Sequence, residues 1–185
     1  MTKPKRAKST GISLSTSSLE AALAAVKDAV QTRSPKPVLR NVRMGGGFLT
    51  ASNLELQITT PIDYEGEPIL VPHAKLVSIL DAASGDEVTI EPKGNQCVVT
   101  VGNGSWTLPT ESAAEFPVWE PTGLQPIARV PADQFVRAVK STSYATDNES
   151  SRYALGAVLV EMKAGTLTFV GTDGRRLAAF ECEVD

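Results

Sequence analysis

The segment Ser151–Ala178 reads SRYALGAVLVEMKAGTLTFVGTDGRRLA and is the most informative part of the chain. Apolar runs alternate in it with turn residues, a pattern typical of a β-meander. We expect one strand over Leu155–Glu161 and a second over Thr166–Val170, joined by a Lys-Ala-Gly turn. The Asp173-Gly174 pair favours a tight turn into a third strand that begins near Arg176. This segment therefore predicts three consecutive antiparallel strands.

A strand-to-helix pattern occurs three times in the sequence. Its copies begin at Ile12, Ile69 and Ala128, which are 57 and 59 residues apart. A period of this size indicates copies of one supersecondary unit. Behind each helix pattern lie β-rich segments: 38–44, 48–51 and 54–60 in the first copy, 87–91, 96–101 and 105–108 in the second, and the meander in the third. The sequence therefore predicts three β-α-β-β-β units.

Each of the three expected helices is apolar along one side only. The capping-box spacing of Ser17 and Glu20 predicts the start of the first helix, and Pro72 and Pro131 predict the starts of the others. Gly85 predicts the end of the second helix. The apolar stripes comprise Leu19, Leu23, Val26 and Val30, then Leu76, Ile79, Leu80 and Ala83, then Phe135, Val139 and Thr142. Such helices lie on a sheet and turn their other face to water or to a polar partner.

Composition limits the class of protein. With 185 residues and 42% hydrophobic content, the chain can bury a core in one or two domains. No apolar run approaches the roughly 18 residues that a membrane span needs, and the basic N-terminal residues lack the apolar stretch of a signal peptide. Cys97 and Cys182 lie in expected strands without CxxC spacing, so we expect buried thiols in a reducing cytoplasm, with a disulfide as the alternative.

The distribution of charge bears on nucleic-acid binding. The net charge is −3, and without the first ten residues it is −7, which argues against a protein whose whole surface binds DNA. Basic residues fall on the outward helix faces, whereas much of the acid falls in the strand regions. The basic residues are Lys27, Lys75, Arg137 and Lys140, with Arg33 just past the first helix; the acidic ones are Glu55, Asp63, Glu65, Glu67, Glu87, Glu91, Glu161, Glu181 and Glu183. A basic helical layer suits a phosphate backbone, but exposed helices also carry Lys and Arg simply for solvation.

Two ordered motifs resemble the bacterial replicative sliding clamp, the β subunit of DNA polymerase III. That family has an Arg-Tyr-x-Leu strand followed by a Thr-Asp-Gly-x-Arg-Leu-Ala hairpin, and this chain has both at residues 152–155 and 172–178. Three weaker pieces match in the same order: Arg33–Asn41, Asn53–Glu55 and Glu115–Pro117. The similarity runs from about Ser13 onward and leaves only the basic N-terminal segment uncovered.

The resemblance implies an α+β fold of the DNA-clamp type. Family domains contain two β-α-β-β-β units each, with helices on the DNA-facing side and antiparallel sheets outside. We accordingly expect a basic disordered tail at 1–11, a two-unit clamp domain at 12–120, and the first unit of a second domain at 126–185. A family subunit has six units, so we expect either a fragment of a clamp or a short form that closes a twelve-unit ring from four chains.

The resemblance also implies residues that contact DNA. Arg33, Lys75, Arg152 and Tyr153 fall on family positions near the DNA-facing surface, and Lys27, Arg137 and Lys140 join them from the helix faces. Ala74 and Ala154 stand where the family often has a basic residue and an aromatic residue, which weakens both contacts. Tyr153 has an alternative role as an edge residue that shields a strand.

A client-peptide cleft and a subunit interface are implied as well. The cleft residues are Leu155, Thr172, Gly174, Arg175, Arg176 and Leu177, with Arg175 at a position where histidine is common. An apolar floor beside a turn suits an extended peptide anchored by hydrophobic side chains, although Leu155 and Leu177 can also be read as core residues. Trp106 and Leu108 lie on the strand where family rings close, without the flanking basic residues, which Asn103 and Ser105 replace.

No catalytic constellation emerges from the sequence. His73 is the single histidine and is expected at the surface, and Gly45–Gly47 joins two strands rather than opening a helix as a phosphate loop does. The resemblance implies a non-catalytic processivity factor without metal or cofactor. Its expected partners are duplex DNA, the polymerase III catalytic subunit, the clamp loader, repair-protein peptides and further clamp subunits, with no membrane. The alternative is a truncated or decoy fragment that binds client peptides without forming a ring.

Overall fold

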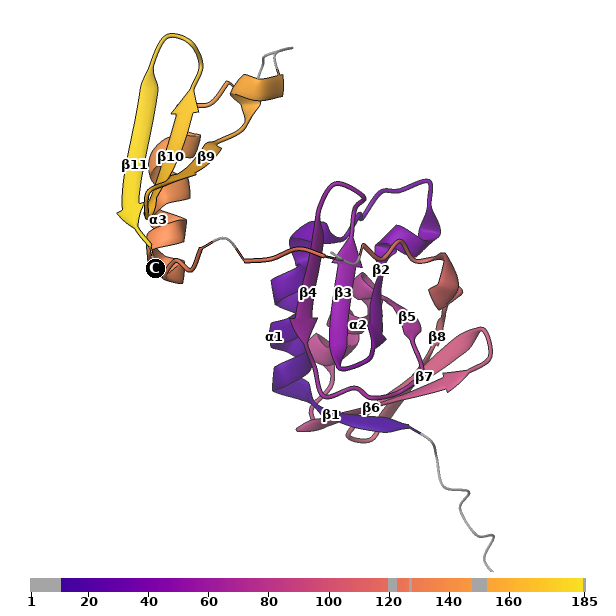
Figure 1. Cartoon of the computed structure of the whole chain (residues 1–185). Coiled ribbons are helices and arrows are strands. Elements are labelled where there is room, and N and C mark those ends of the chain that lie inside the picture. Colours follow the sequence, from indigo (N-terminus) through magenta and orange to yellow (C-terminus); the bar gives the residue numbers. More distant parts are fainter. Residues whose placement is uncertain (1–10, 120–122, 127, 148–152, 185) are drawn as a thin grey trace, which may run out of the picture. The chain divides into compact units, whose positions relative to one another are not determined.

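The computed structural model of the chain describes residues 11–119, 123–126, 128–147 and 153–184, and of Tyr153 and Ala154 the backbone only (Figure 1). The chain divides into two compact units, Met1–Glu120 and Pro121–Asp185, which are taken in turn. Unit 1 contains two helices and eight strands among its described residues. Unit 2 contains one helix and three strands among its own.

Unit 1 consists of two successive β-α-β-β-β repeats, as the sequence predicts. The first comprises β1 (Ile12–Ser15), α1 (Thr16–Val26), β2 (Asn41–Gly45), β3 (Phe48–Ser52) and β4 (Gln57–Pro61). The second comprises β5 (Ile69–Pro72), α2 (His73–Ala82), β6 (Glu87–Lys93), β7 (Gln96–Val101) and β8 (Gly104–Pro109). Short 3-10 turns lie at η1 (Lys27–Ala29), η2 (Pro37–Arg40) and η3 (Ala113–Glu115).

The two repeats of unit 1 exchange their first strands. The sheets have the orders β1-β6-β7-β8 and β4-β3-β2-β5, so the first strand of each repeat joins the meander of the other. All pairs are antiparallel, with Leu14 opposite Val88 in one sheet and Val71 opposite Val42 in the other. Each four-stranded sheet therefore takes one of its strands from the other repeat. This exchange therefore ties both repeats into one domain.

The helices of unit 1 form a common core with the sheets. α1 contacts α2 and strands β3 and β4 (Figure 1). Leu19, Leu23 and Val26 of α1 are buried, as are Leu76 and Leu80 of α2, which confirms the expected apolar stripes. Complete burial of such a side chain stabilises the fold by about 1.5–3 kcal/mol, because its apolar surface leaves water.

Two helix ends differ from the prediction. The N-cap of α1 is Ser15, whose hydroxyl accepts a hydrogen bond from the Ser18 N–H at 3.4 Å, so the prediction of Ser17 is wrong. α2 ends at Ala82 rather than at Gly85, because Ala83 already has extended backbone angles (φ −95°, ψ 151°). The Ser17–Glu20 pair therefore does not mark the start of α1, and Gly85 does not mark the end of α2.

Unit 2 is a single helix on a three-stranded meander. It comprises α3 (Ala132–Ser143), η4 (Tyr153–Gly156), β9 (Leu159–Lys163), β10 (Thr166–Thr172) and β11 (Leu177–Glu183), in sheet order β11-β10-β9. α3 contacts β10 and β11, and Ala138, Leu167, Phe169 and Cys182 form the small core. Gly171 lets α3 approach closely, because a Cβ there would collide with the carbonyl oxygen of Thr142.

The start of the meander differs from the prediction. Residues 153–156 form the turn η4, so the first strand begins at Leu159 and not at Leu155. Residues 128–130, expected as the first strand of the third repeat, have no regular secondary structure. The second and third strands lie where the sequence predicts them.

The two cysteines are free and buried, which confirms the expected burial of both thiols. Burial raises the pKa of the Cys97 thiol to about 11, since the charged thiolate is poorly solvated in the core. Across the described residues, no helix combines the length and the apolar character that crossing a membrane requires.

Candidate functional site

The turn between β10 and β11 is fixed by its own side chains. The Thr172 hydroxyl donates to the Arg176 carbonyl at 2.7 Å and accepts from the Gly174 N–H at 3.1 Å. Asp173 Oδ1 accepts from the N–H groups of Arg175 and Arg176, both at 2.9 Å. Gly174 has φ +83°, a left-handed conformation that glycine adopts without strain. The turn is therefore preorganised by four hydrogen bonds among neighbouring residues.

The charges of this turn support the same geometry. Asp173 Oδ2 pairs with Arg176 Nε at 3.0 Å. The backbone N–H groups of Arg175 and Arg176, followed by the Arg176 charge, lower the pKa of Asp173, because each stabilises the carboxylate. The Arg176 guanidinium lies 5.7 Å from the ring centroid of Tyr144, within cation–π distance. Tyr144 follows α3 and lies outside its apolar stripe, so helical periodicity gives no signal for its role.

Leu177 projects from the end of this turn into solvent. Its side chain is 67% exposed, so the alternative that it is a core residue is wrong. Arg175 is also exposed, whereas Leu155 is half-buried on the separate segment η4. The structure thus brings five of the six expected cleft residues together in residues 172–177, and Leu155 lies apart from them in the sequence. The Leu155 carbonyl accepts from the Asp147 N–H at 2.8 Å, which ties η4 to the segment after α3.

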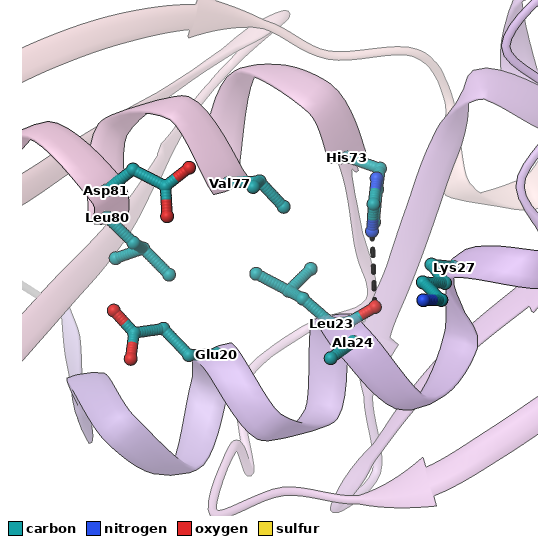
Figure 2. Close-up of a pocket in the computed structure, with 8 residues that line it drawn as sticks. All are labelled: Glu20, Leu23, Ala24, Lys27, His73, Val77, Leu80 and Asp81. Atoms are coloured by element: carbon teal, nitrogen blue, oxygen red, sulfur yellow. Dashed lines mark hydrogen bonds between the residues drawn. The ribbon is translucent and has the colours of Figure 1, made fainter.

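A groove of about 390 Å³ separates α1 from α2 (Figure 2). Its apolar walls include Leu23, Val77 and Leu80. Figure 2 shows Glu20 and Asp81 at one end and Lys27 with His73 at the other. His73 is half-buried at the side of this groove, and its Nε2 lies 3.2 Å from the Leu23 carbonyl oxygen.

The charge of the helical layer in unit 1 differs from the prediction. Lys27 and Lys75 are exposed on this layer, but so are Glu20, Asp28 and Asp81. The helical layer of unit 1 is therefore mixed in charge and not basic. Helix periodicity separates the outward face from the buried one, but it does not set the balance of charge on the outward face.

The other expected DNA-contacting residues occupy separate places. Arg33 is exposed between η1 and η2, and Lys140 is exposed on α3. Arg137, also on α3, places its guanidinium 5.9 Å from the ring centroid of Phe180. Arg152 lies outside the described residues. Tyr153 begins η4, but its side chain lies outside the described part of the structure.

The edge of unit 1 carries the expected interface residues. β8 is the last strand of its sheet and pairs with β7 alone. An apolar groove of about 710 Å³ runs between β8 and α2 and is lined by Trp106, Leu108, Ile79 and Lys75, among others. Trp106 is half-buried, whereas Leu108 is 7% exposed and belongs to the core. Trp106 therefore offers contact area at this edge, and Leu108 supports it from beneath.

Comparison with known proteins identifies the relatives of the chain. The family "DNA polymerase III beta subunit, N-terminal domain" matches residues 10–120. The beta sliding clamp of Synechococcus elongatus is 29% identical over 175 residues, which are 89% of this chain and 47% of that protein. The beta sliding clamp of Pseudomonas aeruginosa is 32% identical over 169 residues, 86% of this chain and 46% of that protein.

Solved structures give the same result. The DNA polymerase III subunit beta from Pseudomonas aeruginosa superposes with a TM-score of 0.83 at 29% identity, covering 94% of this chain and 50% of that one. A sliding clamp from the same organism bound to griselimycin has a TM-score of 0.81 at 30% identity. The chain thus spans about half the length of the relatives that it matches.

Proposed function

The chain belongs to the DNA polymerase III beta subunit family, the bacterial beta sliding clamps, and on this premise we propose that it serves as a sliding-clamp module. In a closed ring it would encircle duplex DNA and tether the replicative polymerase. The observation that carries this proposal is the family match over residues 10–120, which spans the described fold of unit 1. The module would act by its topology and not by catalysis, as a processivity factor does.

Contact with DNA would come from basic side chains on the helices. Lys27 and Lys75 are exposed in unit 1, and Arg137 and Lys140 are exposed in unit 2. Each Lys or Arg that neutralises a phosphate releases a counterion, so such binding is independent of base sequence and weakens with salt. The carboxylates Glu20 and Asp81 line the same groove as Lys27, at its opposite end, and favour a loose contact over a tight one. Loose, sequence-independent contact is compatible with sliding.

The DNA contact can be tested with matched charge reversals. Lys75→Glu should lower affinity for duplex DNA and reduce the slope of log affinity against log salt by about 1 or more, since one phosphate contact is lost. Lys93→Glu is the control, because Lys93 is exposed on the β6–β7 hairpin and not on a helix. Fluorescence anisotropy with labelled duplex measures both. Equal losses of DNA affinity in the two variants would contradict the assignment of the DNA contact to the helical face.

Client binding would use the turn at residues 172–177. The turn is held by hydrogen bonds among its own residues and exposes Leu177, which suits an apolar anchor in an extended peptide. The expected clients are peptides of the polymerase III catalytic subunit, of the clamp loader and of repair proteins. The griselimycin complex of a relative is compatible with ligand binding by this family.

A second candidate function is a peptide-binding module that forms no ring. The same exposed Leu177 favours it, because the turn at residues 172–177 lies within unit 2. Such a module would bind client peptides but would not distinguish circular from linear DNA. A clamp would bind client peptides and would also distinguish circular from linear DNA.

A further inference from the structure

The turn between β3 and β4 in unit 1 has the same design as the turn between β10 and β11 in unit 2. The first reads SNLELQ over residues 52–57, and the second reads TDGRRL over residues 172–177. In each turn the first residue lies opposite the last across the two strands. The two turns therefore occupy the same place in the first and third repeats and correspond residue for residue.

The same hydrogen bonds hold both turns. The Ser52 hydroxyl accepts from the Leu54 N–H at 3.3 Å, as the threonine hydroxyl of the β10–β11 turn accepts from the glycine N–H. Asn53 Oδ1 accepts from the N–H groups of Glu55 and Leu56 at 3.0 and 2.7 Å, as the aspartate of the β10–β11 turn does from its two arginines. The β3–β4 turn is therefore preorganised in the same way.

Leu54 adopts a backbone conformation that leucine rarely takes. Its φ is +78°, close to the +83° of the glycine at the same place in the β10–β11 turn. A side chain in this left-handed region is strained, and glycine avoids the strain. Burial does not explain the leucine, because its side chain is 57% exposed. A strained and exposed apolar side chain on a fixed turn points to contact with a partner.

The last described residues of unit 1 lie against this turn. The Gln57 side chain binds both backbone groups of Trp119: its Oε1 accepts from the N–H at 2.8 Å, and its Nε2 donates to the carbonyl at 2.9 Å. Trp119 is 65% exposed, Val118 beside it 40%, and Leu56 of the turn 45%. Two segments that hydrogen bonds hold together thus expose large apolar side chains, as binding surfaces do.

The charge around this surface differs from that of the β10–β11 turn. Glu55 is exposed where the other turn has Arg175, and Leu56 takes the place of the second arginine. The segment 110–120 contains three glutamates and no Lys or Arg. A partner with complementary charge is therefore basic, whereas the arginines of the β10–β11 turn favour an acidic one.

We propose that residues 52–57, together with residues 118–119, form a second peptide-binding surface, and that it binds an extended partner peptide with apolar and basic side chains. The apolar side chains of the peptide contact Leu54, Leu56 and Trp119, and its Lys or Arg pairs with Glu55. This inference rests on the proposed function for its mode of recognition, because it extends peptide binding from the β10–β11 turn to the corresponding turn of unit 1.

Two labelled synthetic peptides test the proposal on the full chain. They share a pair of leucines, which lysines flank in one peptide and aspartates in the other, and fluorescence anisotropy measures their binding. Glu55→Arg should raise the Kd of the lysine peptide about tenfold or more, because attraction becomes repulsion. Glu161→Arg is the matched control, since it makes the same change at an exposed glutamate on β9 and should leave this Kd unchanged.

Leu54→Gly tests the apolar contact without threatening the fold. Glycine relieves the strained backbone, so the variant should unfold at the same temperature as the wild type or higher. The Kd of the lysine peptide should nevertheless rise about tenfold, because the exposed leucine side chain is lost. Circular dichroism during heating measures the unfolding temperature.

The outcomes separate this surface from the proposed client site. The proposal is overturned if the lysine peptide does not bind, or if either Glu55→Arg or Leu54→Gly leaves its Kd unchanged. It is also overturned if Leu177→Asp abolishes binding of the lysine peptide, which would assign this peptide to the β10–β11 turn. Binding of the aspartate peptide that Leu177→Asp leaves unchanged would instead contradict the proposed client site alone.

Discussion

Asp173 accepts the backbone N–H groups of the turn with one carboxylate oxygen and pairs with Arg176 Nε at 3.0 Å with the other. One side chain thereby fixes the backbone of residues 173–176 and holds Arg176 over Tyr144. The fixed turn leaves Leu177 exposed beside it. The Asp173 carboxylate therefore contributes to both the shape and the charge of this turn, alongside the two hydrogen bonds of the Thr172 hydroxyl.

Acidification should weaken this turn. The pKa of Asp173 lies below its ordinary value of 3.8, so the ionised group favours the folded state. The stabilisation by ionised Asp173 is complete above the ordinary aspartate pKa. It is lost as the pH falls through the lower pKa that Asp173 has in the folded state. We expect the difference in unfolding free energy between the wild type and Asp173→Asn to be constant near neutral pH and to narrow below pH 3.8. Urea unfolding at stepwise lower pH measures it; a difference that grows on acidification would contradict the account.

Replacement of Leu177 should abolish peptide binding without unfolding the chain. Because the side chain is 67% exposed, Leu177→Asp should change the unfolding free energy by no more than about 0.5 kcal/mol. Loss of the apolar anchor should raise the Kd for a client peptide about thirtyfold or more. Leu124→Asp is the control, since Leu124 is equally exposed at 67% but lies outside the turn. Unchanged peptide affinity in calorimetry for Leu177→Asp would remove the assignment of this site.

The close approach of α3 to β10 should make Gly171 irreplaceable. A Cβ at this position would collide with the Thr142 carbonyl oxygen, so Gly171→Ala should force the helix from the sheet and destabilise unit 2 by about 1–3 kcal/mol. Gly156→Ala is the matched control, because its Cβ would make an ordinary contact of 3.5 Å with the Asp147 carbonyl oxygen. Thermal unfolding distinguishes them; equal effects would contradict the packing described for α3.

The core of unit 1 should be sensitive to truncation at Leu19. This side chain is 1% exposed between α1 and the sheets, so Leu19→Ala should cost about 2–5 kcal/mol through lost burial and a residual cavity. Leu56→Ala should cost far less, because Leu56 is 45% exposed. Urea unfolding followed by tryptophan fluorescence reports on unit 1, because both Trp106 and Trp119 lie in it. A small effect at Leu19 would mean that the helix packs elsewhere.

Local patterns in the sequence were sufficient to predict the repeats and most of the helices and strands. Leu19, Leu23 and Val26 recur at helical spacing and become buried, and the Thr-Asp-Gly sequence specifies the turn through the side chains of Thr172 and Asp173. These features depend on residues close in the chain, which is why periodicity and turn chemistry predict them.

Features that depend on distant residues were not predicted. The exchange of β1 and β5 joins strands of different repeats, and no local pattern indicates which edge a strand will occupy. The turn η4 takes up the beginning of the apolar run 155–161, where the Asp147 N–H of another segment donates to the Leu155 carbonyl. The mixed charge at the α1–α2 groove likewise depends on how Glu20 and Asp81 face each other across two helices.

Retention on circular DNA tests the central claim most directly. The chain is assembled on nicked circular duplex, with a clamp loader where loading requires one, and bound protein is separated from free protein by gel filtration before and after linearisation. A ring around DNA predicts retention on the circle and loss on cutting, since a sliding ring leaves through the free ends. Equal retention on circular and linear DNA, or none on either, would contradict the assignment of this chain as a sliding-clamp module.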